Sequence, residues 1–211
     1  MESVSGEVGS QAICLTELQS FYATLEAACA TAVVDAHSQI SLRHIFALLK
    51  SAMPQRSTSG SQLPVCRHVS AALATARKSE NLRPLVDVFS ALEPHLVWKP
   101  RASSGPHASA NFAVSHANAM IAGPGGLEER DDLWLGVSLL APHVRYPDHT
   151  HPPEETYLVL SEGDFMQWAD NWFTPGIGGS FYNPPGILHA MRSGETPLLA
   201  IWALLPDQVA R

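Results

Sequence analysis

The chain has 211 residues, a hydrophobic fraction of 45%, a charged fraction of 16% and a formal net charge of −7. This length and composition exclude a disordered chain and allow one large domain or one domain with a substantial extension. No apolar run approaches the roughly 18–20 residues of a membrane span, and no signal-peptide pattern begins the chain, so a cytoplasmic protein is expected.

Four segments of the first half have helical spacing. Apolar residues recur at intervals of three and four in residues 16–33, 41–53, 65–79 and 83–96. Thr16 is the expected N-cap of the first helix, and the second is expected to begin at Ser41 and to end before Pro54. A polar loop at 56–64 separates the first pair of helices from the second.

The second half reads as short strands. A segment rich in Pro, Ser and Gly at 99–110 marks the boundary. The expected strands lie between turn residues, at 118–123, 133–142, 156–161, 179–184 and 197–205. Their spacing favours an antiparallel sandwich or small barrel, and the absence of βαβ alternation and of glycine-rich phosphate loops argues against a nucleotide-binding α/β fold. We therefore expect a helical region at 1–105 that packs on a β-barrel at 106–211.

Charge and cysteine usage narrow the class of protein. Residues 1–100 are formally neutral, whereas 101–211 carry the whole net charge, so no basic surface for nucleic acid is expected. Cys14, Cys29 and Cys66 have scattered spacings and are expected to be reduced, as is usual in a cytoplasmic protein.

The stretch HTHPPEETY, residues 149–157, is the candidate metal site. Side chains two apart in an extended segment share a face, so His149 and His151 could bind one ion, with a following carboxylate completing the set. Pro152 and Pro153 separate the histidines from the glutamates and are expected to bend the segment. Strand alternation therefore does not decide whether Glu154 or Glu155 is the carboxylate ligand. His189, which a Pro-Pro-Gly turn presents at the start of the next strand, is the candidate fourth ligand.

These residues resemble the two motifs of the cupin superfamily. HTHPPEE resembles the first motif, and the run from Gly178 to His189 resembles the second. The resemblance covers about 110–205 and implies a mainly β, double-stranded β-helix barrel. It also implies one divalent metal held by His149, His151, Glu155 and His189. Ser193 departs from the pattern, because the family has asparagine there.

The pattern YxxHxHxxxExY and the helical N-terminal region resemble the cupin-type dimethylsulfoniopropionate (DMSP) lyases of marine bacteria. This resemblance implies that Tyr157 is the catalytic base and that Tyr146 is a second tyrosine of the pocket. The implied reaction is β-elimination of a zwitterionic small molecule to acrylate and dimethyl sulfide, with Fe(II), Mn(II) or Zn(II) binding the carboxylate. An aromatic wall is expected for the sulfonium, and Trp202 is a candidate.

Three alternatives stay open on the sequence. His149 and His151 could be ordinary exposed loop histidines. The same ligands could hold Fe(II) in a cupin dioxygenase of a small thiol or aromatic substrate. A non-catalytic cupin sensor could bind DNA through its helices, although the neutral charge of 1–100 argues against this. For the helices, a role as a lid or in a homodimer is favoured.

Overall fold

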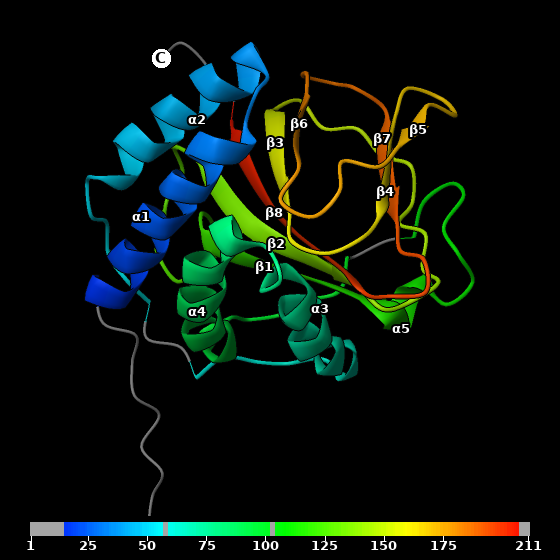
Figure 1. Cartoon of the computed structure of the whole chain (residues 1–211), viewed down its shortest axis with the longest axis horizontal. Coiled ribbons are helices and arrows are strands. Elements are labelled where there is room, and N and C mark those ends of the chain that lie inside the picture. The colour runs from blue at the N-terminus through cyan, green and yellow to red at the C-terminus, as the bar shows by residue number, and fades with distance from the viewer. Residues whose placement is uncertain (1–14, 57–58, 102–103, 207–211) are drawn as a thin grey trace, which may run out of the picture.

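The structure, a computed structural model, describes residues 15–56, 59–101 and 104–206. Helices fill the first half of the chain and strands the second (Figure 1). The helices are α1 (Leu15–Ala32), α2 (Ala36–Leu49), α3 (Val69–Ala76), α4 (Arg83–Leu92) and α5 (Phe112–Ser115), with 3-10 turns η1 (Pro64–His68), η2 (Glu80–Leu82) and η3 (Glu93–His95). The strands are β1 (His116–Ala122), β2 (Trp134–Leu140), β3 (Glu154–Val159), β4 (Asp164–Gln167), β5 (Trp172–Phe173), β6 (Ser180–Asn183), β7 (His189–Arg192) and β8 (Leu198–Leu205).

The four predicted helical segments are helical, but two of the predicted starts are wrong. α1 already includes Leu15, so Thr16 is not its N-cap. α2 begins five residues before Ser41, because the Asp35 side chain accepts a hydrogen bond from the Ser38 backbone N–H at 2.8 Å. That bond satisfies one of the free donors of the first turn, and Ser41 instead faces the interior.

The strands form two antiparallel sheets, with the orders β1-β2-β8-β3-β6 and β5-β4-β7. Aromatic rings join the sheets: the Phe165 ring on β4 lies 5.5 Å from the Tyr157 ring on β3 and 4.8 Å from the Phe181 ring on β6. The predicted class, a mainly β cupin fold with an N-terminal helical region, is confirmed. The short strands β4 and β5 were not predicted, because runs of four and two residues carry little periodicity.

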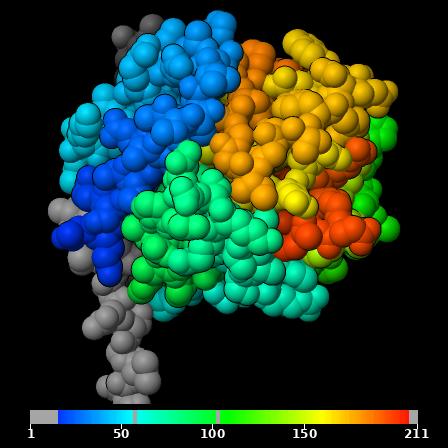
Figure 2. Space-filling view, viewed as in Figure 1, coloured from blue at the N-terminus to red at the C-terminus, as the bar shows by residue number. Residues whose placement is uncertain are grey.

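The helices cover one face of the larger sheet. α2 packs on β3, β6 and β8, and α3 packs on β8, which leaves both faces of β3 buried. In the space-filling view the atoms of the first half of the chain (blue to green) are in direct contact with those of the second half (yellow to red) (Figure 2). Apolar side chains of both halves form a single buried cluster. The division into units at 1–105 and 106–211 stays a prediction.

A buried arginine ties α2 to the strand region. The Arg130 guanidinium donates to the Leu48 and Ser51 carbonyls at 3.0 and 2.9 Å, just at the C-terminal end of α2. It also donates to Glu128 at 2.6 Å and to both oxygens of Asp132 at 2.8 Å. All five guanidinium N–H groups are therefore used.

The cysteines behave as expected where the structure describes them. Cys29 and Cys66 are free and buried. Burial raises the pKa of the Cys29 thiol to about 12, so this thiol is unreactive at neutral pH. Cys14 lies outside the described residues.

Candidate metal centre and adjoining pocket

The segment from 149 to 157, in which the histidines were expected to be extended, divides into a loop and a strand. β3 begins at Glu154, and His149 and His151 lie in the loop before it. Pro152 and Pro153 have no backbone N–H, so the ladder does not continue through them. Placing both histidines on a strand was therefore wrong, whereas the alternation that puts Glu155 and Tyr157 on one face is present.

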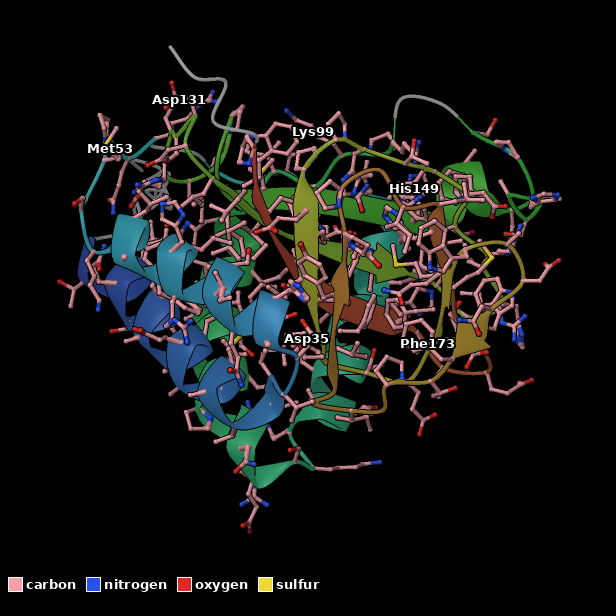
Figure 3. All side chains as sticks on the ribbon, turned by 90° about the horizontal axis from the view of Figure 1, so that it is seen from above. Asp35, Met53, Lys99, Asp131, His149 and Phe173 are labelled. Atoms are coloured by element: carbon pink, nitrogen blue, oxygen red, sulfur yellow. The ribbon has the colours of Figure 1, made fainter. Side chains whose placement is uncertain are left out.

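A short bridge to β7 places the histidines instead. His149 and His189 exchange two backbone hydrogen bonds of 3.0 Å. The Pro-Pro-Gly turn contacts the same loop, because the Gly186 N–H donates to the His151 carbonyl at 2.9 Å. Gly186 has a φ of +73°, a left-handed conformation that favours glycine. His149 lies between the two sheets, on the side of β3 and β6 away from α1 and α2 (Figure 3).

The three imidazoles share one hydrogen-bond pattern. The Nδ1 atoms of His149, His151 and His189 lie 2.9, 2.9 and 3.0 Å from backbone carbonyl oxygens. A carbonyl only accepts, so each Nδ1 carries the ring proton and each Nε2 keeps a free lone pair. The three ligand nitrogens lie within 4.8 Å of one another, and the His189 Nε2 is buried without a hydrogen-bond partner. Outer carbonyls that fix the tautomer are typical of metal-binding histidines, so these residues fit a metal ion.

Glu155 completes the cluster, and Glu154 does not take part in it. Glu155 Oε2 lies 3.4 Å from Nε2 of His151 and 3.4 Å from Nε2 of His189. Asn183 Nδ2 donates to the same oxygen at 3.0 Å, which fixes the carboxylate. Glu154 points away and accepts a hydrogen bond of 2.6 Å from the Tyr182 hydroxyl.

The electrostatics favour neutral imidazoles at His149 and His189 and an ionised carboxylate at Glu155. Burial lowers the pKa of His149 to about 3, with the neighbouring His189 as a further cause, and burial also lowers the pKa of His189. Burial acts the same way on His151, but the hydrogen bond and charge of Glu155 outweigh it and raise its pKa. Burial opposes the charge on Glu155, yet His151 and His189 hold its pKa below the ordinary value. Neutral imidazoles around a carboxylate are the protonation state that binds a divalent cation.

A cavity of about 180 Å³ opens beside this cluster. Its lining combines three of the candidate ligands with aromatic, polar and apolar side chains from β1, β2, β3, β7 and β8. The lining residues are Asn118, Trp134, Ser138, Tyr146, His149, His151, Glu155, Tyr157, Met191, Trp202 and Leu204. A larger surface groove of about 820 Å³ lies around α3 and α4, but none of the three clustered histidines lines it.

Both predicted tyrosines and the predicted tryptophan line this cavity. Tyr157 is buried, stacks on Phe181 with ring centroids 5.0 Å apart, and has a pKa raised well above its ordinary value by burial and then by Glu155. Tyr146 receives a hydrogen bond of 3.2 Å from Asn118 Nδ2. The Trp202 indole N–H donates to Ser138 Oγ at 3.0 Å.

Sequence reasoning missed several residues of the site. Asn118, Ser138 and Trp134 line the cavity, and Asn183 fixes Glu155. The available signal was an isolated polar residue inside an otherwise apolar strand, as in NAMIAG and LGVSLL. That signal does not state the partner, because the partner lies on another strand.

The remaining histidines of the second half take no part in the cluster. His116 is buried, stacks on Phe112 at 3.7 Å, and has both ring nitrogens engaged, by the Phe112 carbonyl and by the Arg101 N–H. His107 and His143 are exposed and lie near the carboxylates of Asp148 and Glu195.

The two antiparallel sheets, with three histidines and a glutamate converging between them, define a cupin-type protein with a site suited to a metal ion. A family model described as dimethylsulfoniopropionate lyase matches residues 37–200. The chain belongs to this DMSP lyase family.

Individual relatives agree with this assignment. The DMSP lyase DddQ of Ruegeria pomeroyi is 29% identical over 116 residues, which are 54% of this chain and 57% of that protein. DddL of Cereibacter sphaeroides is 28% identical over 143 residues, which are 66% of this chain and 58% of that protein. The chain thus spans little more than half the length of these curated relatives.

Solved structures show the same fold. A crystal structure of DddQ from Ruegeria pomeroyi DSS-3 matches with a TM-score of 0.67 at 22% identity, over 94% of this chain and 95% of that chain. A structure from work on the DMSP lyases RdDddP and RnDddQII matches with a TM-score of 0.69 at 20% identity, over 93% and 95%. Both alignments include the N-terminal helices as well as the sheets.

Within the described part of the chain, no helix has the length and apolar character needed to cross a membrane. The cytoplasmic location, the homodimer and the absence of nucleic acid as a partner stay predictions.

Proposed function

We propose that this protein is a metal-dependent carbon–sulfur lyase that cleaves DMSP to acrylate and dimethyl sulfide by β-elimination. The observation that carries the proposal is the position of Tyr157. A buried phenol lies two residues after Glu155, in a cavity that is also lined by Glu155 and by two of the three clustered histidines, His149 and His151. Membership of the DMSP lyase family supports the choice of substrate.

His149, His151, Glu155 and His189 would hold the metal. Three imidazole nitrogens and one carboxylate oxygen suit Fe(II), Mn(II) or Zn(II), and we propose one such ion per chain. When bound, this ion supplies a Lewis acid for the substrate carboxylate and a positive charge that lowers the pKa of a nearby phenol. Asn183 contributes by holding the Glu155 carboxylate in place.

Tyr157 is the proposed general base. In β-elimination the phenolate oxygen takes the proton from the carbon next to the carboxylate, and the released electron pair forms the carbon–carbon double bond. The bond to sulfur breaks, and its electron pair leaves with neutral dimethyl sulfide. Burial raises the pKa of Tyr157, so the base role requires the offsetting positive charge beside Glu155. The rings of Phe165 and Phe181 fix the phenol and keep water away from it.

The aromatic side of the cavity suits the sulfonium end of the substrate. Trp134 and Trp202 line the cavity together with the ligands. A cation on an aromatic face gains about 0.5–2 kcal/mol, which orients a zwitterion whose opposite end lies at the histidines.

The test is headspace detection of dimethyl sulfide from purified, metal-loaded protein supplied with DMSP. Tyr157→Phe should keep its metal and lose activity by the ~10²–10⁴-fold that general base catalysis contributes. Tyr146→Phe should cost less if its role is positioning. Wild-type activity should rise toward alkaline pH as the phenol deprotonates, without oxygen uptake. Normal turnover by Tyr157→Phe would remove the assigned base, and oxygen uptake with a thiol or aromatic substrate but no dimethyl sulfide would favour a dioxygenase.

A further inference from the structure

A chain of side-chain hydrogen bonds lies behind Tyr146. The Trp202 indole N–H donates to Ser138 Oγ at 3.0 Å, and the Ser138 hydroxyl donates to Asn118 Oδ1 at 2.7 Å. The amide of Asn118 then donates to the Tyr146 hydroxyl oxygen at 3.2 Å. All four residues line the same cavity, and we call Asn118, Ser138 and Trp202 the relay.

Three neighbouring strands build the relay. Asn118 on β1 is the direct cross-strand partner of Ser138 on β2, and Trp202 on β8 pairs with Gly136, two residues before Ser138. The indole crosses β2 at this glycine: a Cβ on Gly136 would lie 2.3 Å from two indole carbons. Glycine weakens the interior of a strand, so its presence here is explained by the space that the indole needs.

The relay has a fixed direction. An indole N–H can only donate, so Ser138 accepts from Trp202, and the Ser138 hydrogen has Asn118 Oδ1 as its acceptor within the described residues. The Asn118 amide oxygen is thereby engaged, and its NH₂ group faces Tyr146. The Tyr146 oxygen consequently accepts from the protein, and its own hydrogen is left to donate into the cavity.

We propose that the relay fixes the Tyr146 hydroxyl as a hydrogen-bond donor to the carboxylate end of the substrate. The inference rests on the proposed lyase function and deepens it. A donor aimed at this end stabilises the negative charge that develops on the carboxylate as the neighbouring proton leaves. Asn118, Ser138 and Trp202 are positioning residues, since they act through Tyr146.

The decisive substitution is Asn118→Asp, which keeps the shape and reverses the polarity. A carboxylate accepts from both Ser138 and Tyr146, so the Tyr146 hydrogen turns away from the cavity. We expect kcat to fall on the order of 10²-fold, the lower range for loss of an oxyanion-type donor. The fall should disappear in a Tyr146→Phe background, because the substitution acts through that hydroxyl. The matched control is Asn171→Asp, an exposed site outside the cavity, which should change kcat less than about twofold.

Other outcomes would overturn the relay. If the Asn118 amide has the opposite orientation, its oxygen accepts from the Tyr146 hydroxyl. A carboxylate oxygen would then accept the same hydrogen bond, so Asn118→Asp would leave kcat unchanged. Equal losses with and without the Tyr146 hydroxyl would indicate a purely structural role. Should Asn118→Asp fail to fold, Ser138→Ala replaces it: kcat should fall about 2–10-fold, the value of one hydrogen bond, and again only when Tyr146 is present.

Calorimetric binding of acrylate to the metal-loaded protein separates this inference from the proposed function. Asn118→Asp and Tyr146→Phe should each weaken acrylate binding by about tenfold or more, as expected for one hydrogen bond to a charged group. Weakened acrylate binding without any dimethyl sulfide from wild-type protein would refute the lyase and keep the relay. Dimethyl sulfide production with unchanged acrylate binding in both variants would refute the relay and keep the lyase. Wild-type protein that neither cleaves DMSP nor binds acrylate would refute both.

Discussion

Arg130→Met is expected to destabilise the whole protein, because Arg130 links the helical region to the sheets. The guanidinium is 1% exposed, and its partner Glu128 is fully buried. The substitution leaves that carboxylate without its cation, takes its side-chain donor from the Ser51 carbonyl, and leaves the Leu48 carbonyl with backbone donors alone. Removing one partner of a buried ion pair typically costs about 3–5 kcal/mol. A loss of this size is a large part of the usual stability of a domain.

Urea unfolding at pH 7, extrapolated to water, measures this loss. The matched control is Arg56→Met, which removes an exposed arginine that lies 3.4 Å from Glu129. An exposed pair contributes about 0–1 kcal/mol, so the same chemical change should have little effect there. The difference between the two variants isolates the effect of burial.

The pH dependence gives a second check. Burial raises the pKa of Glu128, and Arg130 opposes that shift in the wild type. Without Arg130 the pKa of Glu128 is higher in the folded state than in the unfolded state. The folded state therefore binds the carboxyl proton more tightly, and the destabilisation is largest at neutral pH, where the unfolded carboxyl is ionised. It should shrink as the pH falls toward about 4.5, where the unfolded carboxyl is protonated too. A penalty below about 1 kcal/mol at pH 7, equal to that of Arg56→Met, would refute the reasoning.

Four further predictions follow from the site and the packing. His189→Ala should lose most of the bound metal in elemental analysis, whereas Glu154→Ala and the exposed control His143→Ala should retain it; an empty site in Glu154→Ala would contradict the assignment of Glu155. Metal content should fall as the pH drops below neutral, because Glu155 raises the pKa of His151 and a protonated imidazole cannot bind metal; dialysis across the pH range measures this, and metal retained at pH 4 would contradict it. Gly136→Ala should cost about 1–3 kcal/mol through overpacking on Trp202, while Gly194→Ala, with open space around it, should be tolerated; equal melting temperatures would refute the close approach. The fragment 106–211 should be less stable than the whole chain because α2 and α3 cover its sheet; two independent melting transitions of the whole protein would count against this.

Much of the fold was accessible from local pattern. The helical spacing of 16–33 and the apolar run of 197–205 predicted α1 and β8 to within one residue at each boundary. The start of α2 was missed, because Asp35 takes the capping role five residues earlier than the apolar pattern suggested. β4 and β5 were missed because they are stabilised by pairing with β7 and with each other, and not by their own composition.

The candidate site, too, was predictable from the sequence only in part. Residue types and their spacing singled out His149, His151, Glu155 and His189, and alternation along β3 placed Tyr157 beside Glu155. The two prolines prevented the strand from reaching the histidines, and the bridge between His149 and His189 placed them instead. A bridge between residues forty apart leaves no trace in local periodicity.

The sequence by itself determined which groups can do chemistry here, because ligand and base identities depend on residue type and on short-range alternation. Only the tertiary structure decided how those groups are held. The relay of Asn118, Ser138 and Trp202 exists because β1, β2 and β8 pair in one register, and Gly136 is needed only once an indole lies across it. From the sequence alone, Arg130 would be assigned to the surface. Its burial depends on the end of α2, where the Leu48 and Ser51 carbonyls accept its hydrogen bonds. Such contacts arise from the pairing of distant segments, which depends on the packing of the whole core.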